Sequence, residues 1–249
     1  MLCILTVIPI GLKPQEEIQV SRCNIQVNVD PASGQIVCKA EFINPQDTAF
    51  ILNKDMQIHW IAVDGKPVAY KKMSTDIVSN AYEIIVPARK SVKFVYSGKI
   101  IAASYPPEIN VANMVSPKLV EIARYVGWYP RPKNSLFGFE LEADLPADFI
   151  TITNGFLLDE KLENNRRKTK WHSDGPVSDI VLLAAPGLKK SVHEEKDLTI
   201  EFYFDKLPED YIKKMQNQLS QAMKELENFF GPARADKFVR VAYSPRQGW

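Results

Sequence analysis

The sequence predicts a mainly β fold: a large antiparallel β-sandwich or saddle domain, followed by the first helix and strand of an incomplete α/β domain. Two observations support this prediction. From residue 18 to residue 196, short segments with an apolar residue at every second position alternate with turn-forming residues, as in antiparallel strands with one buried face. After residue 197 the apolar period becomes that of an amphipathic helix, and one more strand pattern follows it.

The composition is that of a globular protein without a strongly charged partner. Its 249 residues are enough for one large or two ordinary domains. Lys and Arg number 31 and Asp and Glu 30, so the net charge of +1 gives no electrostatic reason to expect nucleic acid as a partner. Cys3, Cys23 and Cys38 lack the close Cys or His pairing of a zinc finger, and we interpret them as small core residues.

The N-terminal segment, residues 1–17, allows two interpretations. Residues 1–12 are almost all apolar, but a membrane-spanning helix needs about 20 such residues. The run also lacks the basic start and the cleavage site of a signal peptide, and Pro9 and Gly11 interrupt it. It is either an N-terminal edge segment or the remnant of a membrane helix, and the protein is accordingly expected to be cytoplasmic or anchored to a membrane.

The first two strands are expected to form a hairpin. Apolar residues alternate over residues 23–29 and again over residues 36–42. Between them, Asp30-Pro31-Ala32-Ser33-Gly34 contains the residues that favour a turn. Further strands are predicted at residues 58–63, 81–86, 92–96, 137–141, 149–153, 180–185 and 198–204, with turns at residues 64–67 and at Asn154-Gly155.

Two segments interrupt the strand pattern. Residues 100–132 contain five prolines, Pro106, Pro107, Pro117, Pro130 and Pro132, and predict a long excursion over the sheet or a loop that reaches another domain. The basic run at residues 164–168 is expected to be a solvated hairpin tip.

Residues 208–230 predict one amphipathic helix, which begins at a proline and ends before Gly231. It would be roughly 35 Å long. Because its apolar stripe needs a partner layer, we predict that a second domain begins at residue 197, with a boundary near residues 194–197. The stripe consists of Ile212, Met215, Leu219, Met223, Leu226, Phe229 and Phe230.

The sequence predicts no catalytic, cofactor-binding or metal-binding residue. The three histidines, His59, His172 and His193, lie in or beside predicted strands. Residues 193–197 begin like the metallopeptidase pattern His-Glu-x-x-His, but Asp197 stands where the second histidine is needed, and the pattern requires a helix. The sequence lacks the Gly-x-Ser-x-Gly, Walker and Gly-x-Gly-x-x-Gly motifs, and its scattered carboxylates suggest no acid–base pair.

Four stretches, taken in order, carry a resemblance to a known family. They are Gly127-Trp128-Tyr129-Pro130, residues 137–155 from Phe-Gly-Phe-Glu-Leu to Asn-Gly, residues 176–187, and residues 226–249. This order and spacing resemble the N-terminal half of the aminopeptidase N family of zinc metallopeptidases. The first three stretches resemble the β-domain of that family, and the fourth resembles the helix and first strand of its thermolysin-like catalytic domain.

The resemblance implies three domains: residues 1–17, the β-domain at 18–196, and the start of the catalytic domain at 197–249. The family usually has an aspartate soon after the proline-containing segment, and residues 131–135 have none, which indicates a divergent branch. The Gly-x-Met-Glu-Asn motif, the His-Glu-x-x-His helix and the downstream Glu ligand are expected beyond residue 249. No cofactor is therefore expected in this chain, and zinc is expected in the missing catalytic domain.

Two functions follow from these patterns. The resemblance implies a β-domain that walls the substrate cleft of a zinc aminopeptidase, with the remainder of its own catalytic domain and a peptide substrate as partners. The alternative is a β-sandwich interaction or adhesion module without hydrolase activity. The parent gene distinguishes them, since a His-Glu-x-x-His helix downstream supports the first, whereas a stop codon or further β-repeats support the second.

Overall fold

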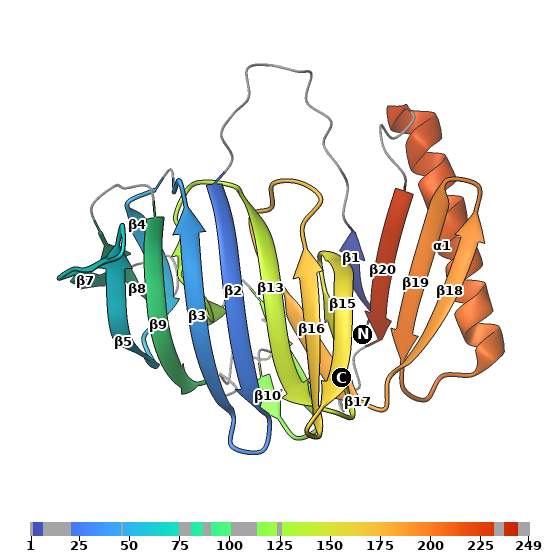
Figure 1. Cartoon of the computed structure of the whole chain (residues 1–249). Coiled ribbons are helices and arrows are strands. Elements are labelled where there is room, and N and C mark those ends of the chain that lie inside the picture. The colour runs from blue at the N-terminus through green and yellow to red at the C-terminus, as the bar shows by residue number, and fades with distance from the viewer. Residues whose placement is uncertain are drawn as a thin grey trace. The chain divides into compact units, whose positions relative to one another are not determined.

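The structure is a computed structural model that describes residues 2–6, 21–45, 47–74, 81–86, 91–100, 114–123, 126–231 and 237–243. Among these residues it is mainly β with one α-helix, which confirms the predicted fold class (Figure 1). The elements are β1 (Leu2–Thr6), β2 (Ser21–Asp30), β3 (Gln35–Ile43), β4 (Ala49–Asn53), β5 (Met56–Val63), β6 (Lys66–Pro67), β7 (Lys71–Ser74), β8 (Ala81–Ile85), β9 (Ser91–Lys99), β10 (Met114–Ser116), β11 (Leu119–Ile122), β12 (Arg131–Pro132), β13 (Phe137–Pro146), β14 (Phe149–Thr153), β15 (Phe156–Glu163), β16 (Arg166–His172), β17 (Leu182–Pro186), β18 (Lys189–Glu195), β19 (Leu198–Phe204), α1 (Glu209–Phe230) and β20 (Lys237–Tyr243).

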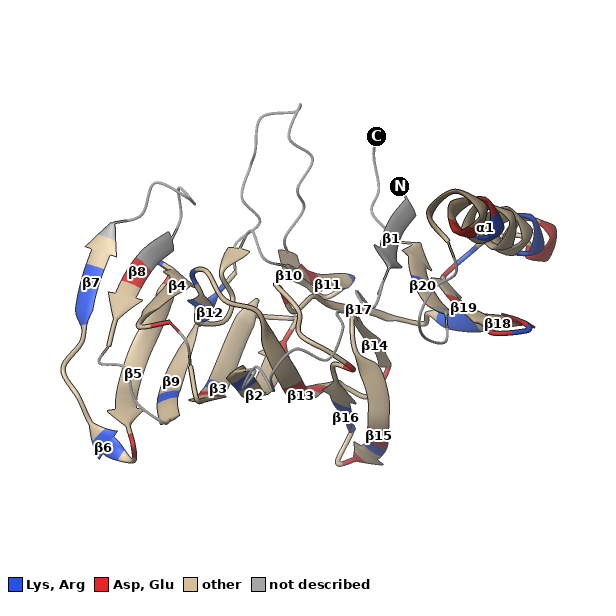
Figure 2. Cartoon of the chain, turned by 90° about the horizontal axis from the view of Figure 1, so that it is seen from above, with Lys and Arg blue, Asp and Glu red and all other residues tan. Residues whose placement is uncertain are grey.

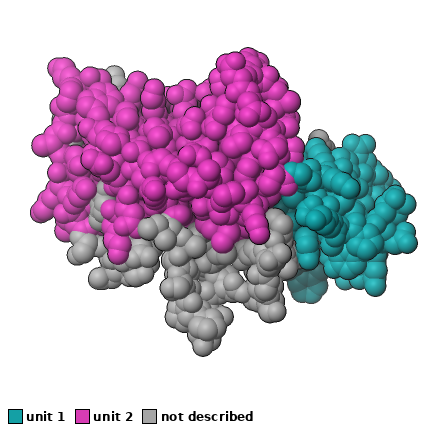
Figure 3. All heavy atoms as spheres, turned by 90° about the horizontal axis from the view of Figure 1, so that it is seen from below, with its two compact units in different colours: residues 1–18, 187–249 teal, residues 19–186 magenta. Residues whose placement is uncertain are grey.

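The chain divides into two compact units (Figure 3). The larger unit spans residues 19–186, and the smaller one combines residues 187–249 with residues 1–18. The larger unit contains an eight-stranded sheet in the order β15-β16-β13-β2-β3-β9-β5-β6 and two four-stranded sheets, β10-β11-β17-β14 and β12-β4-β8-β7. The smaller unit contains the sheet β1-β20-β19-β18 and the helix α1.

The smaller unit begins before the boundary expected from the sequence. β18 pairs antiparallel with β19, so residues 189–195 belong to the smaller unit, although the boundary was expected at residues 194–197. Most side chains of β18 are polar and none is fully buried, which leaves little apolar alternation to reveal this strand. The division into independently folding domains at 1–17, 18–196 and 197–249 stays a prediction.

Part of the N-terminal segment is a strand. Residues 2–6 form β1, which pairs antiparallel with β20 at the edge of its sheet. For these residues the structure agrees with the edge-segment interpretation, while residues 7–17 lie outside the described part of the chain. No helix among the described residues combines the length and the apolar character that crossing a membrane requires.

The hairpin β2–β3 forms the middle of the eight-stranded sheet, as predicted. Along β2, buried and exposed side chains alternate strictly. Cys23 and Cys38 are fully buried and unpaired, which agrees with their interpretation as core residues, whereas the side chain of Cys3 lies outside the described part. On its other side β2 pairs with β13, and this central pair is parallel, unlike its neighbours in the sheet.

An aromatic cluster joins two sheets of the larger unit. The ring of Phe50, on β4, lies 5.0 Å from that of Phe42 and 5.1 Å from that of Phe94, which belong to the eight-stranded sheet. Phe137 packs against Phe42 at 6.0 Å. All four side chains are fully buried. Their tilted and edge-on contacts are the arrangement that aromatic rings prefer, so the two layers are packed as in a β-sandwich.

The prediction of a solvated hairpin tip at residues 164–168 is only partly correct. Asn164 and Asn165 form the turn, with φ angles of 51° and 58°, a conformation that asparagine tolerates better than most residues. Arg166 to Lys168 instead belong to β16. The guanidinium group of Arg166 lies 2.7 Å from Asp144 on β13, so this arginine crosslinks two strands and is not a solvated tip residue.

The helix α1 packs only part of its apolar stripe on the sheet of the smaller unit. Ile212 is buried against β19, and Met215, Leu219 and Met223 are partly buried there. Leu226, Phe229 and Phe230 are 47, 82 and 76% exposed, contrary to a single core-facing stripe. A helix of 22 residues is about 33 Å long, whereas a seven-residue strand such as β19 spans about 23 Å. The C-terminal turns of the helix therefore extend beyond the strands.

Glu195, at the end of β18, links the sheet of the smaller unit to α1. Its carboxylate accepts a hydrogen bond from Lys224 Nζ at 2.6 Å and another from the hydroxyl of Ser220. These two hydrogen bonds lower the pKa of Glu195 to about 2. The ionised carboxylate thus holds the helix against the β18–β19 hairpin.

We predict that acid weakens this link. Because the pKa of Glu195 is about 4.5 in the unfolded chain and about 2 in the folded one, its contribution is complete above pH 4.5 and is lost as the pH falls through 2. Glu195→Gln should therefore lose less stability than the wild type between these pH values, measured by urea unfolding. Glu194→Gln, on the neighbouring exposed residue, is the matched control. A parallel pH dependence of the Glu195→Gln variant and the wild type would contradict this role.

Candidate functional site

Parts of three of the four stretches that carry the family resemblance meet at one buried place in the larger unit. Trp128 and Tyr129 lie between β11 and β12 and are fully buried, with their ring centroids 5.0 Å apart. The Nε1–H group of Trp128 donates a hydrogen bond to the carbonyl oxygen of Ile180 at 3.1 Å. The segment before β17 is therefore held directly by the Gly-Trp-Tyr-Pro motif, although about fifty positions separate them in the sequence.

The phenol of Tyr129 makes two hydrogen bonds to the same segment. It donates to Asp179 Oδ1 at 3.0 Å and accepts from the N–H group of Ile180 at 3.1 Å. Burial, and after it the neighbouring Asp179 carboxylate, raises the pKa of the Tyr129 phenol well above its usual value. The hydroxyl keeps its proton as a result, so it serves as a structural donor and acceptor and is poorly suited to transfer a proton.

The Asn154-Gly155 motif holds the segment from its other side. Asn154 Nδ2 donates to the carbonyl oxygen of Asp179 at 2.9 Å, and Asn154 Oδ1 accepts from the N–H group of Val181 at 3.1 Å. Gly155 is needed for space, since a Cβ there would lie 2.4 Å from the carbonyl oxygen of His172. Tyr129, Trp128 and Asn154 together determine the backbone path of residues 179–181; we call this group the motif junction.

Asp47 holds residues 134 and 135, which follow β12, by three hydrogen bonds. Asp47 Oδ2 accepts hydrogen bonds from the N–H groups of Asn134 and Ser135, at 3.0 and 2.9 Å, and from the Ser135 hydroxyl at 2.6 Å. Residues 131–132 form the short strand β12, which pairs with β4. A residue from the connection between β3 and β4 thus fixes the backbone just after β12.

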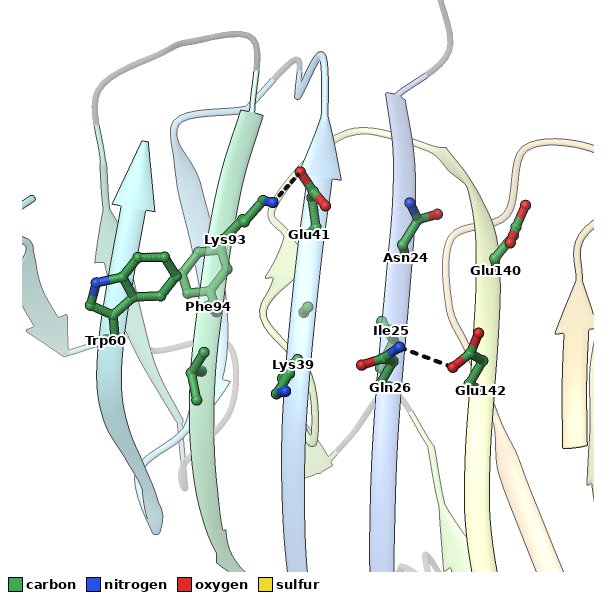
Figure 4. A pocket seen from close by; sticks show the side chains of 12 residues that line it. Asn24, Ile25, Gln26, Lys39, Glu41, Trp60, Lys93, Phe94, Glu140 and Glu142 are labelled. Carbon is green, nitrogen blue, oxygen red and sulfur yellow. Dashed lines mark hydrogen bonds and ion pairs between the residues drawn. The ribbon is translucent and has the colours of Figure 1, made fainter. Parts of the chain in front are cut away.

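A shallow hollow of about 590 Å³ lies on the outer face of the eight-stranded sheet (Figure 4). One cross-strand row of five residues crosses it, and the indole of Trp60 at the end of this row is 38% exposed. The row exists because each residue is the register partner of the next on the adjacent strand. Its members are Glu142, Gln26, Lys39, Val95 and Trp60.

The hollow has the chemistry of a contact surface. Gln26 Nε2 donates to Glu142 Oε2 at 3.0 Å, and Lys93 forms an ion pair with Glu41 at 3.2 Å (Figure 4). The residues that line it include no serine, cysteine, threonine or histidine, so they provide no nucleophile–base pair. Trp60 is exposed beside a β-bulge between Ile58 and Trp60, a feature that redirects side chains.

Within the larger unit, His59 and His172 lie far apart in the sheet and do not share a site. His59, on β5, shares a 2.7 Å hydrogen bond with Ser97, and His172, on β16, packs against Phe156. Four strands separate β5 from β16 in the sheet order. His193 lies on β18 in the smaller unit. Within the part of the chain that the structure describes, no group of three or more His, Cys, Asp and Glu side chains could hold a metal ion.

The sequence analysis missed a buried charged pair in the smaller unit. Arg240 Nε lies 2.7 Å from Glu201 Oε2, and the arginine is 4% exposed. Although burial opposes the charge of Glu201, the hydrogen bond from Lys190 and the charge of Arg240 lower its pKa. The sequence does contain a signal, since Glu201 is the one charge in the apolar strand β19 and Arg240 interrupts the apolar part of β20; the register pairs the two positions.

Solved structures share the fold of this chain, although no protein-family model and no curated protein matches its sequence. An M1 zinc metallopeptidase variant of Deinococcus radiodurans, bound to a Tyr-Ser-Ala substrate, has a TM-score of 0.68 at 13% identity, over 92% of this chain and 57% of that chain. A two-domain M1 zinc metallopeptidase bound to L-arginine has a TM-score of 0.69 at 14% identity, with the same coverage. Legionella pneumophila aminopeptidase A, in complex with aspartic acid, has a TM-score of 0.64 at 15% identity, over 89% of this chain and 28% of that chain.

These comparisons confirm the fold that the resemblance implies. The fold of the chain is similar to that of the N-terminal part of M1 zinc metallopeptidases, and the chain spans 57% of the length of the Deinococcus structures. At these identities the similarity establishes the fold alone.

We predict that the motif junction is a main determinant of stability in the larger unit. Tyr129→Phe removes the acceptor of the buried N–H group of Ile180, which should lower the free energy of unfolding by about 1–3 kcal/mol. Urea unfolding measures this loss. Tyr211→Phe, on an exposed tyrosine of α1, is the matched control and should change stability little. Equal stability of the two variants would show that the junction is not a determinant.

Proposed function

We propose that this chain is the N-terminal β-domain region of a zinc-dependent aminopeptidase-like protein, whose parent hydrolyses peptides at their N-terminus. The observation that carries this proposal is the extent of the structural match. One alignment to an M1 zinc metallopeptidase covers 92% of the chain, and therefore includes most of both compact units. A β-sandwich shared by chance would match the larger unit only.

In this proposal the chain contributes shape, and the chemistry comes from the remainder of the catalytic domain. A catalytic zinc needs three protein ligands around an open position, and it polarises the scissile carbonyl and activates water. The cleft-shaping role rests on the fixed packing of the β-domain, in which the motif junction holds the backbone of residues 179–181 by hydrogen bonds on two sides.

The exposed end of α1 supports a partner in the remainder of the catalytic domain. Phe229 and Phe230 are 82 and 76% exposed, and their rings contact each other at 4.7 Å. Together with Leu226 they form an apolar surface on the turns that extend beyond β19. Large apolar side chains gathered in this way are typical of a surface that another part of the protein covers.

The second candidate is an interaction module without hydrolase activity, which the hollow around Trp60 favours. An exposed indole beside amide and charged groups is suited to bind a ligand by contact and hydrogen bonding. Under this alternative, Trp60→Ala abolishes the function of the parent. Under the aminopeptidase proposal, the same substitution leaves hydrolysis unchanged.

We predict that zinc and activity appear together when the parent's C-terminal extension is present. The 249-residue chain should neither bind zinc at one tight site nor release an aminoacyl fluorophore, whereas the extended protein should do both, and a chelator should abolish the release. Elemental analysis and fluorescence measure the two properties. Stoichiometric zinc together with chelator-sensitive hydrolysis by the 249-residue chain would contradict the proposal that zinc binding and catalysis need the C-terminal extension.

A second prediction tests whether the remainder of the catalytic domain covers the exposed C-terminal end of α1. Phe230→Glu should change the stability of the 249-residue chain by less than about 0.5 kcal/mol, because the side chain is already exposed. In the extended protein it should lower the melting temperature by several degrees, since a charge would then enter an apolar contact. Tyr211→Glu, at the exposed beginning of the helix, controls for added charge. Equal effects of Phe230→Glu in the two proteins would contradict the proposed contact.

A further inference from the structure

Three hollows on the outer face of the eight-stranded sheet share lining residues and form one groove. The hollow beside Trp60 shares Asn24 and Glu140 with a second hollow, of about 270 Å³. It shares Gln26 and Glu142 with a third, of about 440 Å³. From Trp60 to Glu142 the groove crosses the strands β5, β9, β3, β2 and β13, whose spacing of about 4.8 Å gives a length of roughly 19 Å. A groove of this length accommodates a chain of several rings better than a single small molecule.

The indole of Trp60 offers a flat apolar surface at one end of the groove. The β-bulge leaves two successive residues of β5, His59 and Trp60, exposed, instead of one buried and one exposed. Seen from outside the sheet, the indole presents the face of its rings (Figure 4). By contrast, Trp128 and Trp171 are fully buried. An indole face open at the surface is suited to stack against the apolar side of a ligand ring.

Side chains along the rest of the groove provide both donors and acceptors of hydrogen bonds. The amide groups of Asn24 and Gln26 each contain donors and an acceptor. The ammonium group of Lys39 donates, whereas the carboxylate of Glu142 accepts. Lys39 and Glu142 are the register partners of Gln26 on the two adjacent strands, so these groups form a continuous polar row. A ligand with hydroxyl groups on successive rings would find here the donor and the acceptor that each hydroxyl needs.

The charges of the groove balance one another, which disfavours an anionic ligand. Three of its lysines are each paired with a carboxylate that also lines it, and residues of both signs are distributed over the strands of this sheet (Figure 2). Nucleic acids and other polyanions bind where positive charge is in excess. The groove therefore fits an uncharged ligand. The pairs are Lys93–Glu41, Lys170–Glu140 and Lys161–Asp159, at 3.2, 2.9 and 3.1 Å.

We propose that this groove binds an unbranched, uncharged oligosaccharide, with one sugar ring stacked on the indole of Trp60. A sugar ring has an apolar side of C–H groups and a rim of hydroxyl groups, which match the indole and the polar row beside it. A peptide is less suited, because β2, β3 and β9 already pair on both sides and leave no backbone groups for an added strand. The inference does not rest on the aminopeptidase proposal, since the groove lies entirely in the larger unit.

Isothermal titration calorimetry of the full 249-residue chain with maltohexaose, cellohexaose and N-acetylchitohexaose tests the proposal. At least one of these sugars should bind with a Kd below about 1 mM, and Trp60→Ala should weaken that binding by about tenfold or more. Trp60→Phe keeps an aromatic ring and should retain most of the affinity. Gln26→Leu, which removes the amide at similar size, should weaken binding several-fold. Tyr211→Ala, which removes an exposed aromatic ring from α1, is the matched control and should leave binding unchanged.

Melting temperatures separate a lost contact from lost folding, since the side chains of Trp60 and Gln26 are exposed and their substitution should leave the fold intact. Failure of all three sugars to bind at about 1 mM, or equal binding by Trp60→Ala and the wild type, would overturn the proposal. Tighter binding of a heparin hexasaccharide, or of an uncharged decapeptide, than of the neutral sugars would also overturn it, because the groove would then select an anion or a peptide. Hydrolysis by the extended protein is measured separately, so a negative result here leaves the aminopeptidase proposal intact.

Discussion

The larger unit depends on the buried phenol of Tyr129, which fixes the segment before β17. A buried hydroxyl needs a donor and an acceptor, and the segment before β17 provides both, through the N–H group of Ile180 and the carboxylate of Asp179. Asn154 holds the same segment on its other side. Because β17 is the middle strand between β11 and β14, the position of this segment also determines how that sheet covers the core.

Strands with a clear apolar alternation could be predicted from the sequence, whereas strands dominated by charged residues, such as β15, β16 and β18, could not. β2 and β3 alternate apolar and polar residues because only one side of each is buried. β15 and β18 have no buried residue, so their sequences carry no such period. The pairing of β2 with β13 was also invisible, because nothing local in either strand identifies a partner so distant in the chain.

For the candidate site, too, the motifs could be found in the sequence but the contacts between them could not. Gly-Trp-Tyr-Pro, Asn-Gly and the segment before β17 were each recognisable as motifs, yet their mutual hydrogen bonds required the folded chain. The pair of Glu201 and Arg240 was missed because each charge looks like an isolated exception in an apolar strand. Only the parallel register of β19 and β20 shows that the two exceptions compensate each other.

The parallel pair β2–β13 has a consequence for the way this chain folds. It joins residues 116 positions apart, as between Gln26 and Glu142, whereas the hairpin β2–β3 needs only the turn after Asp30. Local pairing precedes distant pairing because a shorter loop is easier to close. During synthesis at about 5–20 residues per second, roughly ten seconds separate the appearance of β2 from that of β13. For that interval the free edge of β2 is exposed on the nascent chain, and a chaperone that shields it would raise the yield of folded protein.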